Sequence, residues 1–239
     1  MTVLPHIANT VPVAEFAPLG VLAFTTTRAA GSFGTSGDEP VHEVMGRWDA
    51  LRATLDPVSR RLASASQVHG GRVVVHAPGW EGWLRVAGAD GHASSAPGTA
   101  MGVTIADCVP VFIAHPSGAV ALLHSGWRGT VARIVERGIT ALSGFGHAPA
   151  DLHVHLGPSI CGRCYQVSPD VFAQLTGRSA EAPATVDLRA LIAGHARAAG
   201  VRDISTSPMC TRCNNDVLFS HRAGDAGRQL AVMLAPSSA

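Results

Sequence analysis

The chain has 239 residues, of which 46% are hydrophobic and 15% charged; this composition is typical of a globular protein and argues against a disordered one. A formal net charge of +1 argues against a nucleic-acid or membrane-surface protein. The first residues lack the pattern of a secretory signal, and no stretch approaches the roughly 18 apolar residues of a spanning helix. We therefore expect a cytoplasmic protein with reduced cysteines.

The first half of the chain predicts strands and one helix. Residues 19–27 and 72–76 are rich in β-branched residues and are predicted to be strands. Between them, apolar residues at helical spacing predict an amphipathic helix over residues 40–55. Three apolar runs then follow closely within residues 99–123.

The second half predicts a helix, a strand, another helix and a closing strand, over residues 131–142, 151–156, 187–199 and 229–234. Thr130 and Asp187 can cap the two helices. In the strand between them, His153 and His155 alternate with apolar residues and are expected to face solvent. Because strands outnumber crossover helices, we expect an α+β protein with mixed sheets and helices packed outside them.

The Pro-Ser-Gly sequence at residues 116–118 separates two of the apolar runs and predicts a β-hairpin. This order suits a three-residue loop, a type I turn followed by a left-handed residue. Such a loop pairs His115 with Ala119 and places Cys108 diagonal to His124 on one side of the ribbon. Diagonal neighbours lie roughly 7–8 Å apart, close enough for a thiolate and an imidazole to share a metal. A two-residue loop would place them on opposite faces, so the prediction depends on the turn.

His69 lies in the string QVHG, immediately before the strand predicted at residues 72–76. There its side chain can point into a cleft together with Cys108 and His124. Three protein ligands with a free fourth position are typical of a catalytic zinc. A histidine before a strand is also commonly a surface or core residue, and spacing leaves both interpretations open.

Two CxxC pairs, at Cys161/Cys164 and Cys210/Cys213, form the pattern of a structural zinc held by four cysteines. Their separation exceeds that of common zinc ribbons. Reduced thiols or a labile disulfide are the alternatives.

Five strings, in this order, resemble the YfiH-like family, whose members are called laccase-domain, multicopper polyphenol oxidase or purine nucleoside phosphorylase proteins. They are QVHG (67–70), ADCVPVFI (106–113), HSGWRGT (124–130), GPSICGRCYQV (157–167) and LFSHRAGDAGR (218–228). The resemblance runs from about Phe24 to the C-terminus. It implies a single domain over residues 1–239 with a four-layer α/β/β/α arrangement of mixed sheets.

The resemblance also implies a zinc held by His69, Cys108 and His124. The activities it implies are phosphorolysis of adenosine, inosine, guanosine and methylthioadenosine, and deamination of adenosine. We therefore expect a nucleoside and phosphate as partners, and neither nucleic acid nor membrane. The oligomeric state is not fixed by the sequence, and a monomer is compatible with it. The family implies no second metal, and Cys161 and Cys213 look like additions to its pattern.

Arg28, in TTTRAAGS, matches the family's entry segment and is the candidate phosphate ligand, because an arginine fork fits two phosphate oxygens at once. Ala29 and Ala30 stand where the family favours glycine, and a solvated loop arginine is the alternative. Asp107 precedes Cys108 and is the candidate carboxylate that orients a ligand or substrate. An ordinary turn or capping residue is the alternative for Asp107.

Two further arginines lie in the matching strings. Arg222 matches the first of two successive arginines in a family string, but Ala223 replaces the second. The sequence around Trp127 and Arg128 leads into a helix whose N-terminus can bind an anion, although Trp127 is equally suited to the core.

Three other functions are open alternatives. A copper oxidase acting on phenols would need many histidines for several coppers, whereas this chain offers one compact ligand set. A cysteine hydrolase could use Cys108 as nucleophile and His124 as base. A non-enzymatic binding protein is the last alternative, and no groove or patch in the sequence indicates it.

Overall fold

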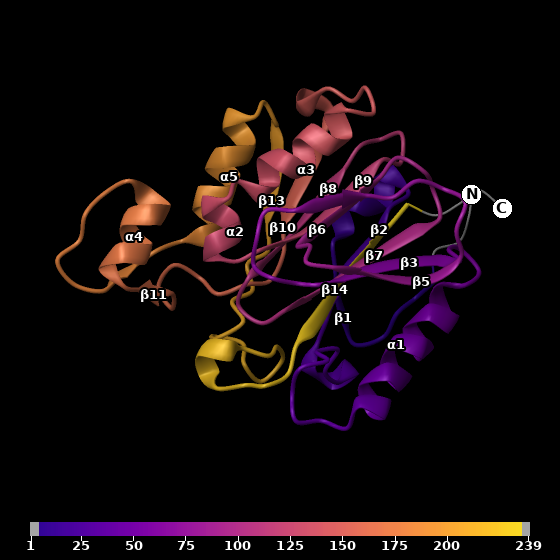
Figure 1. Cartoon of the computed structure of the whole chain (residues 1–239), viewed down its shortest axis with the longest axis horizontal. Helices are drawn as coiled ribbons and strands as arrows, with labels where there is room; N and C mark the ends of the chain where they lie inside the picture. Colours follow the sequence, from indigo (N-terminus) through magenta and orange to yellow (C-terminus); the bar gives the residue numbers. More distant parts are fainter. Residues whose placement is uncertain (1–4, 236–239) are drawn as a thin grey trace.

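The computed structural model describes residues 5–235, and it has four layers (Figure 1). The first six-stranded sheet has the order β1 (Thr10–Pro12), β2 (Leu22–Thr26), β14 (Gln229–Leu234), β7 (Thr99–Ile105), β3 (Arg61–Ser66) and β5 (Gly82–Ala87). The second has the order β13 (Asp203–Thr206), β10 (His153–Leu156), β8 (Val109–Ala114), β9 (Val120–Ser125), β6 (Gly91–Ser94) and β4 (Val73–Val75). Both sheets mix parallel and antiparallel pairs, which confirms the expectation of mixed sheets.

Helices cover the outer faces of the two sheets. They are α1 (Val41–Leu55), α2 (Trp127–Val131), α3 (Ile134–Ser143) and α5 (Leu188–Ala198), whereas α4 (Pro169–Thr176) lies to the side of the sheets and packs against α2 (Figure 1). Figure 1 shows α1 on one side of the sheets and α3 and α5 on the other. Short 3-10 turns and a small sheet complete the fold: η1 (Ala14–Leu19), η2 (Arg28–Ala30), η3 (Pro149–Asp151), η4 (His221–Ala223), β11 (Gln166–Val167) and β12 (Ala184–Thr185).

Three apolar clusters hold these layers together. On the first sheet, α1 buries Trp48 and Leu51, because its apolar residues recur at helical spacing. Met101 and Phe112 belong to the cluster between the two sheets. On the outer face of the second sheet, α3 and α5 bury a further cluster that includes Ile139. This arrangement confirms the four-layer α/β/β/α fold (Figure 1).

Most predicted elements are present, including the helix at α1, the Asp187-capped helix at α5 and the closing strand β14. The helix predicted over residues 131–142 is wrong in its start, because the chain forms two helices there. Arg133 separates α2 from α3 with a left-handed φ of +58°. Thr130 lies inside α2 and its hydroxyl donates to the carbonyl of Gly126, so it does not cap a helix.

The prediction that His155 faces solvent is also wrong. The second sheet is covered on both faces, and η1 lies over the side of β10 from which His155 projects. The Nδ1 atom of His155 lies 2.7 Å from a carboxylate oxygen of Glu15 and 2.8 Å from the hydroxyl of Ser205. Alternation along a strand distinguishes two faces, but it does not show what covers each of them. Among residues 5–235, no helix is long and apolar enough to span a bilayer.

Candidate metal centre

The hairpin of β8 and β9 positions two of the three candidate ligands. Ala114 pairs with Val120, and Gly118 closes the loop with a left-handed φ of +90°. The predicted three-residue loop and its register are therefore confirmed. As a consequence, Cys108 and His124 lie close together at the far end of the hairpin.

His69 joins them from the loop between β3 and β4. One potential ligand atom from each of His69, Cys108 and His124 lies within 4.8 Å of the other two. The two imidazole rings stand at 78° to each other, with centroids 4.8 Å apart. The side-chain amide of Gln67 anchors this loop, because it exchanges two 2.8 Å hydrogen bonds with the backbone of Thr104. Three separate segments thus bring the predicted ligands together.

Asp90 is the residue of this site that sequence reasoning missed. Its fully buried carboxylate accepts a 2.9 Å hydrogen bond from the backbone N–H of His69 and a 2.7 Å bond from that of Gly70. The same carboxylate lies 2.9 Å from Nδ1 of His124, which directs Nε2 of that ring towards Cys108. One carboxylate therefore positions both histidines. The available sequence signal was an acidic residue just before a buried strand.

The backbone at His69 and at Gly126 packs closely against the three candidate ligands. His69 has a φ of +60°, which is strained for a non-glycine residue and is held by its bond to Asp90. A Cβ atom at Gly126 would lie 2.8 Å from Sγ of Cys108 and 3.4 Å from the ring of His69. Glycine is therefore required for the sulfur to occupy this position.

The donor set fits a zinc ion. Two imidazoles and one thiolate are ligands that zinc takes, and three of them leave a fourth position for a water or a substrate. The contact between Nδ1 of His124 and Asp90 and the close packing against Gly126 pre-organise that geometry.

Cys108 and His124 form an electrostatically coupled pair. Burial raises the pKa of Cys108, but the charge and hydrogen bond of His124, helped by His69, outweigh it and lower this pKa to about 6. Burial lowers the pKa of His124, whereas the Cys108 thiolate and the Asp90 carboxylate raise it to about 9. Near neutral pH the thiolate is favoured, which is the form that binds metals and also the form that acts as a nucleophile.

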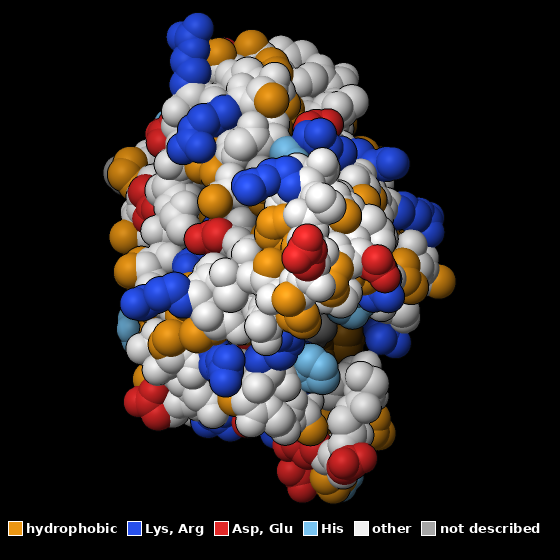
Figure 2. All heavy atoms as spheres, turned by 90° about the vertical axis from the view of Figure 1, so that its left-hand side faces the viewer, with side chains coloured by type: hydrophobic (Ala, Val, Ile, Leu, Met, Phe, Trp, Pro, Cys, Tyr) orange, Lys and Arg blue, Asp and Glu red, His pale blue; other side chains and the backbone are white. Residues whose placement is uncertain are grey.

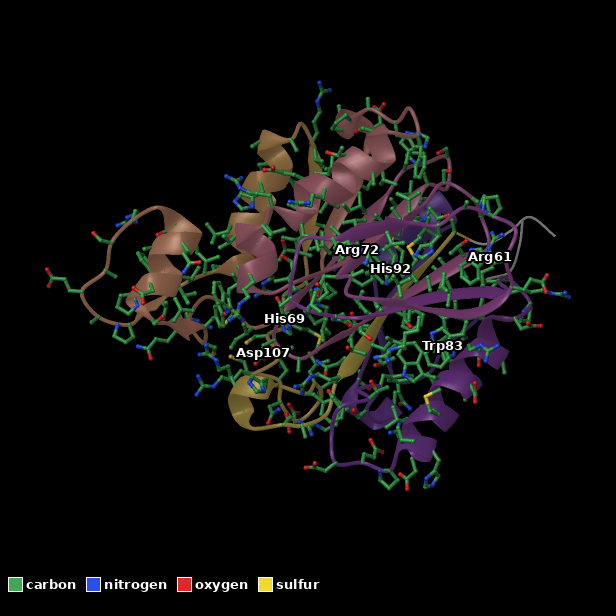
Figure 3. All side chains as sticks on the ribbon, in the orientation of Figure 1. Arg61, His69, Arg72, Trp83, His92 and Asp107 are labelled. Atoms are coloured by element: carbon green, nitrogen blue, oxygen red, sulfur yellow. The ribbon has the colours of Figure 1, made fainter. Side chains whose placement is uncertain are left out.

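A cavity of about 940 Å³ opens over the three ligands, a size in the usual range for small-molecule sites. Aromatic and cationic side chains line it, among them Phe33, Trp83, Trp127, Tyr165, Arg128 and Arg222. Figure 3 labels His69, Trp83 and Asp107, which all belong to its wall. Burial raises the pKa of Tyr165 to about 12, so its hydroxyl stays protonated and can donate a hydrogen bond. Such a cavity can hold a flat aromatic ring beside an anion.

Arg28 does not belong to the residues that line this cavity. Its guanidinium forms a 2.7 Å ion pair with Asp225 and donates to the carbonyls of Asn215 and Leu218. It also lies over the ring of Phe219, 4.4 Å from the centroid. With its donors engaged by protein groups, Arg28 is better placed to hold the C-terminal loop than to bind phosphate.

Asp107 lies in the cavity wall with a left-handed φ of +80°. Its buried carboxylate accepts hydrogen bonds from the hydroxyls of Thr211 and Ser220. It also accepts a 2.7 Å bond from the backbone N–H of Arg222. Asp107 therefore ties the segment before Cys108 to the loop that carries Arg222, which supports a positioning role.

Comparison with known proteins places these features in a family. Residues 27–235 match the family model described as multi-copper polyphenol oxidoreductase laccase. A purine nucleoside phosphorylase of Deinococcus radiodurans is 35% identical over 211 residues, covering 82% of this chain and 78% of the relative. A purine nucleoside phosphorylase of Mycobacterium tuberculosis is 36% identical over 217 residues, covering 83% of this chain and 85% of the relative.

Two solved structures have the same fold. The YfiH protein of Bacillus licheniformis superposes with a TM-score of 0.86 at 22% identity, over 95% of this chain and 97% of that protein. YlmD of Geobacillus stearothermophilus gives a TM-score of 0.84 at 27% identity, over 91% of this chain and 93% of that protein. The motifs, the four-layer fold and the extent of these matches show that the chain belongs to the YfiH-like family of laccase-domain proteins.

Proposed function

We propose that this protein is a zinc-dependent purine nucleoside phosphorylase acting on adenosine, inosine, guanosine and methylthioadenosine. The observation that carries this proposal is the convergence of His69, Cys108 and His124 on the lining of a cavity that also presents aromatic and arginine side chains. The names of the relatives support the same class of reaction.

His69, Cys108 and His124 would hold the zinc. When bound, zinc supplies a Lewis acid that polarises a substrate oxygen. The set contains only two histidines and one cysteine, which favours one zinc over the several coppers of a multicopper oxidase.

The remaining residues of the cavity suit a purine nucleoside and phosphate. The flat rings of Trp83 and Tyr165 offer apolar faces for the purine. Arg128 is exposed, with its guanidinium over the ring of Trp127 at 4.3 Å from the centroid, so its donors can reach an anion. The backbone of Arg222 is fixed by Asp107, and its guanidinium lies over the Tyr165 ring at 4.8 Å, where one nitrogen donates to the carbonyl of Gln166 and the other donors are left for an anion. The two arginines are our candidates for the phosphate ligands.

In the proposed reaction, a phosphate oxygen attacks the anomeric carbon of the ribose while the bond from that carbon to the purine nitrogen breaks. The purine leaves with the bonding electron pair and takes up a proton, and ribose 1-phosphate is the other product. Arg128 and Arg222 would align the phosphate and offset its charge, since positioning and electrostatic stabilisation supply most of such a rate enhancement. The protonated hydroxyl of Tyr165 is available to donate a hydrogen bond to the substrate.

Adenosine deamination is a second activity that this site can support. Attack of water at the amino-bearing carbon of adenine releases ammonia and gives inosine, and it needs no phosphate. A metal with an open position and a cavity that admits the base suit both reactions.

The decisive experiment is incubation of the purified, metal-analysed protein with adenosine and with inosine, each with and without phosphate. We expect about one equivalent of zinc that depends on His69, and free base plus ribose 1-phosphate only when phosphate is present. Ammonia release from adenosine without phosphate would add the deaminase activity. Oxidation of phenols by a copper-loaded protein that leaves nucleosides intact would refute the proposal.

A cysteine hydrolase is the second candidate, because one observation favours it. Asp90, His124 and Cys108 follow one another in hydrogen-bonding contact, as an orienting acid, a base and a nucleophile do. His69 is unnecessary for that mechanism, whereas a three-ligand metal site requires it. An enzyme indifferent to chelators but rapidly inactivated by thiol reagents would favour the hydrolase.

A further inference from the structure

The two CxxC pairs, far apart in the sequence, meet in the structure. The first follows β10, and the second follows β13, the parallel neighbour of β10 in the second sheet. Beyond these strands the two segments remain side by side, since Ser159 and Cys210 form a parallel β-bridge. The parallel pairing thus carries Cys161 and Cys164 to the same end of the sheet as Cys210 and Cys213.

The four sulfur atoms converge on one point. All of them lie within 4.8 Å of one another, and Sγ of Cys164 lies 3.5 Å from Sγ of Cys213. In a tetrahedral site with Zn–S bonds of about 2.3 Å, neighbouring sulfurs are roughly 3.8 Å apart. The observed cluster therefore has the dimensions of a tetrathiolate metal site.

The backbone is arranged to stabilise a thiolate at Cys210. Sγ of Cys210 accepts hydrogen bonds from the backbone N–H groups of Cys161, at 3.3 Å, and Cys213, at 3.4 Å. The N–H of Cys164 donates to the carbonyl of Cys161 at 3.0 Å, which closes the first CxxC turn. N–H groups directed at sulfur stabilise negative charge there.

Each CxxC pair contains an arginine, whose charge is opposite to that of a tetrathiolate site. Four thiolates around a divalent ion leave two negative charges, and both turns have the same form, Cys-x-Arg-Cys, with Arg163 and Arg212 in the third position. The face turned to the viewer in Figure 2, on the side where α4 lies, shows several exposed arginine side chains.

We propose that Cys161, Cys164, Cys210 and Cys213 bind a structural zinc ion. Four protein ligands leave no open position, so this zinc would stabilise the fold and take no substrate. It would tie together two segments that reach the cavity. Tyr165 directly follows the first pair, and Thr211, within the second, donates a hydrogen bond to Asp107. This inference stands independently of the proposed catalytic function.

Native mass spectrometry and metal analysis of the full chain test this proposal without any substitution. We expect two zinc ions per chain and five reduced cysteines. A chain with a disulfide among these four cysteines, or with no zinc beyond that bound at Cys108, would overturn the proposal. Iron in place of zinc, visible as a red protein, would overturn the zinc assignment.

A pair of variants then assigns each metal to its site. Cys213→Ser should lose one zinc and keep the other, with a Tm lower by about 5–10 °C, because a ligand that binds only the folded state stabilises it. Cys108→Ala should lose the other zinc and keep the tetrathiolate one. If the site at Cys108 binds no metal, the wild type should carry one zinc, and Cys213→Ser should lose it. Equal zinc content in Cys213→Ser and the wild type would contradict the proposal.

The absorption spectrum of the cobalt-substituted protein reports which side chains bind the metal. Four thiolates give cobalt strong sulfur-to-metal charge-transfer absorption, whereas a site with one thiolate gives a weaker band. We expect the stronger band to persist in Cys108→Ala and to disappear in Cys164→Ser. The opposite pattern would overturn the assignment.

Discussion

Residues 5–235 contain two clusters of side chains that could hold a metal ion, and the two differ in construction. The centre of His69, Cys108 and His124 stands at the end of the two large sheets, and its ligands are fixed by a buried carboxylate and a strained backbone. The four-cysteine cluster stands on two loops, and the sulfur of Cys210 accepts hydrogen bonds from two backbone N–H groups. The first has three ligands facing a cavity and the second has four facing one another.

A reactive metal site and a structural one are expected to differ in two ways: in the number of protein ligands, and in how far neighbouring residues must hold those ligands in place. A metal that meets a substrate needs an open position, so the protein itself must hold the three ligands in place. In the catalytic candidate that task falls to Asp90 and Gly126. A closed site needs less outside support, because the four bonds to the metal hold the loops. The following predictions test this contrast, from the largest expected effect to the smallest.

Replacing His69 should have the largest effect. In His69→Ala only two ligands remain, so we expect loss of the zinc at this centre and a fall in nucleoside turnover of about 10³-fold or more, since a catalytic metal supplies several kcal/mol. Circular dichroism should show the fold unchanged. His42→Ala, an exposed change on α1, is the control and should keep both zinc and turnover. Full activity of His69→Ala would falsify the three-ligand mechanism and favour Cys108 as a free nucleophile.

Replacing the buried carboxylate should weaken metal binding without removing a ligand. In Asp90→Asn the amide nitrogen cannot accept from the loop N–H groups, and the hold on both histidines loosens. We expect zinc affinity at this centre to fall about 10–100-fold, measured by competition with a chelating dye. Asp49→Asn changes an exposed carboxylate on α1 and should leave affinity unchanged. Wild-type affinity in Asp90→Asn would show that the histidines need no such support.

Adding one methyl group should have opposite effects at Gly126, which is crowded, and at Gly46, which is on the open surface of α1. In Gly126→Ala the new Cβ meets Cys108 Sγ at 2.8 Å, and we expect zinc affinity and turnover to fall about tenfold because overpacking costs ~1–3 kcal/mol. Gly46 on α1 has nothing within 4 Å of its added Cβ. Gly46→Ala should therefore raise stability by about 0.5–1 kcal/mol, measured by urea unfolding. If the two variants behave alike, the packing around Cys108 is unimportant.

The smallest expected effects are those of replacing Arg128 and Arg28, which should change different properties. Arg128→Ala should raise the KM for phosphate about fivefold, the equivalent of ~1 kcal/mol for an exposed charged contact, with little change in stability. Arg28→Ala should instead cost about 1–2 kcal/mol of stability, because it removes an ion pair and two hydrogen bonds, and should leave that KM unchanged. A phosphate KM raised only in Arg28→Ala would return the phosphate role to Arg28.

The sequence by itself determined the elements whose residues carry their own periodicity or turn chemistry. Helix α1 and the capped helix α5 were predicted from apolar spacing and an Asp cap. The Pro-Ser-Gly loop fixed the β8–β9 register, and with it the proximity of Cys108 and His124. These features are local, because each depends on residues within a few positions of one another.

Only the tertiary structure decided the features that depend on contacts between distant segments. Asp90 lies 21 residues from His69 and 34 from His124, and its position before a strand does not by itself identify it as their common partner. Arg28 acquired its ion pair from a residue 197 positions away. The covering of His155 and the meeting of the two CxxC pairs likewise follow from how the sheets pack and which strands lie side by side. Pairing and burial are properties of the assembled layers, so local pattern could not reveal them.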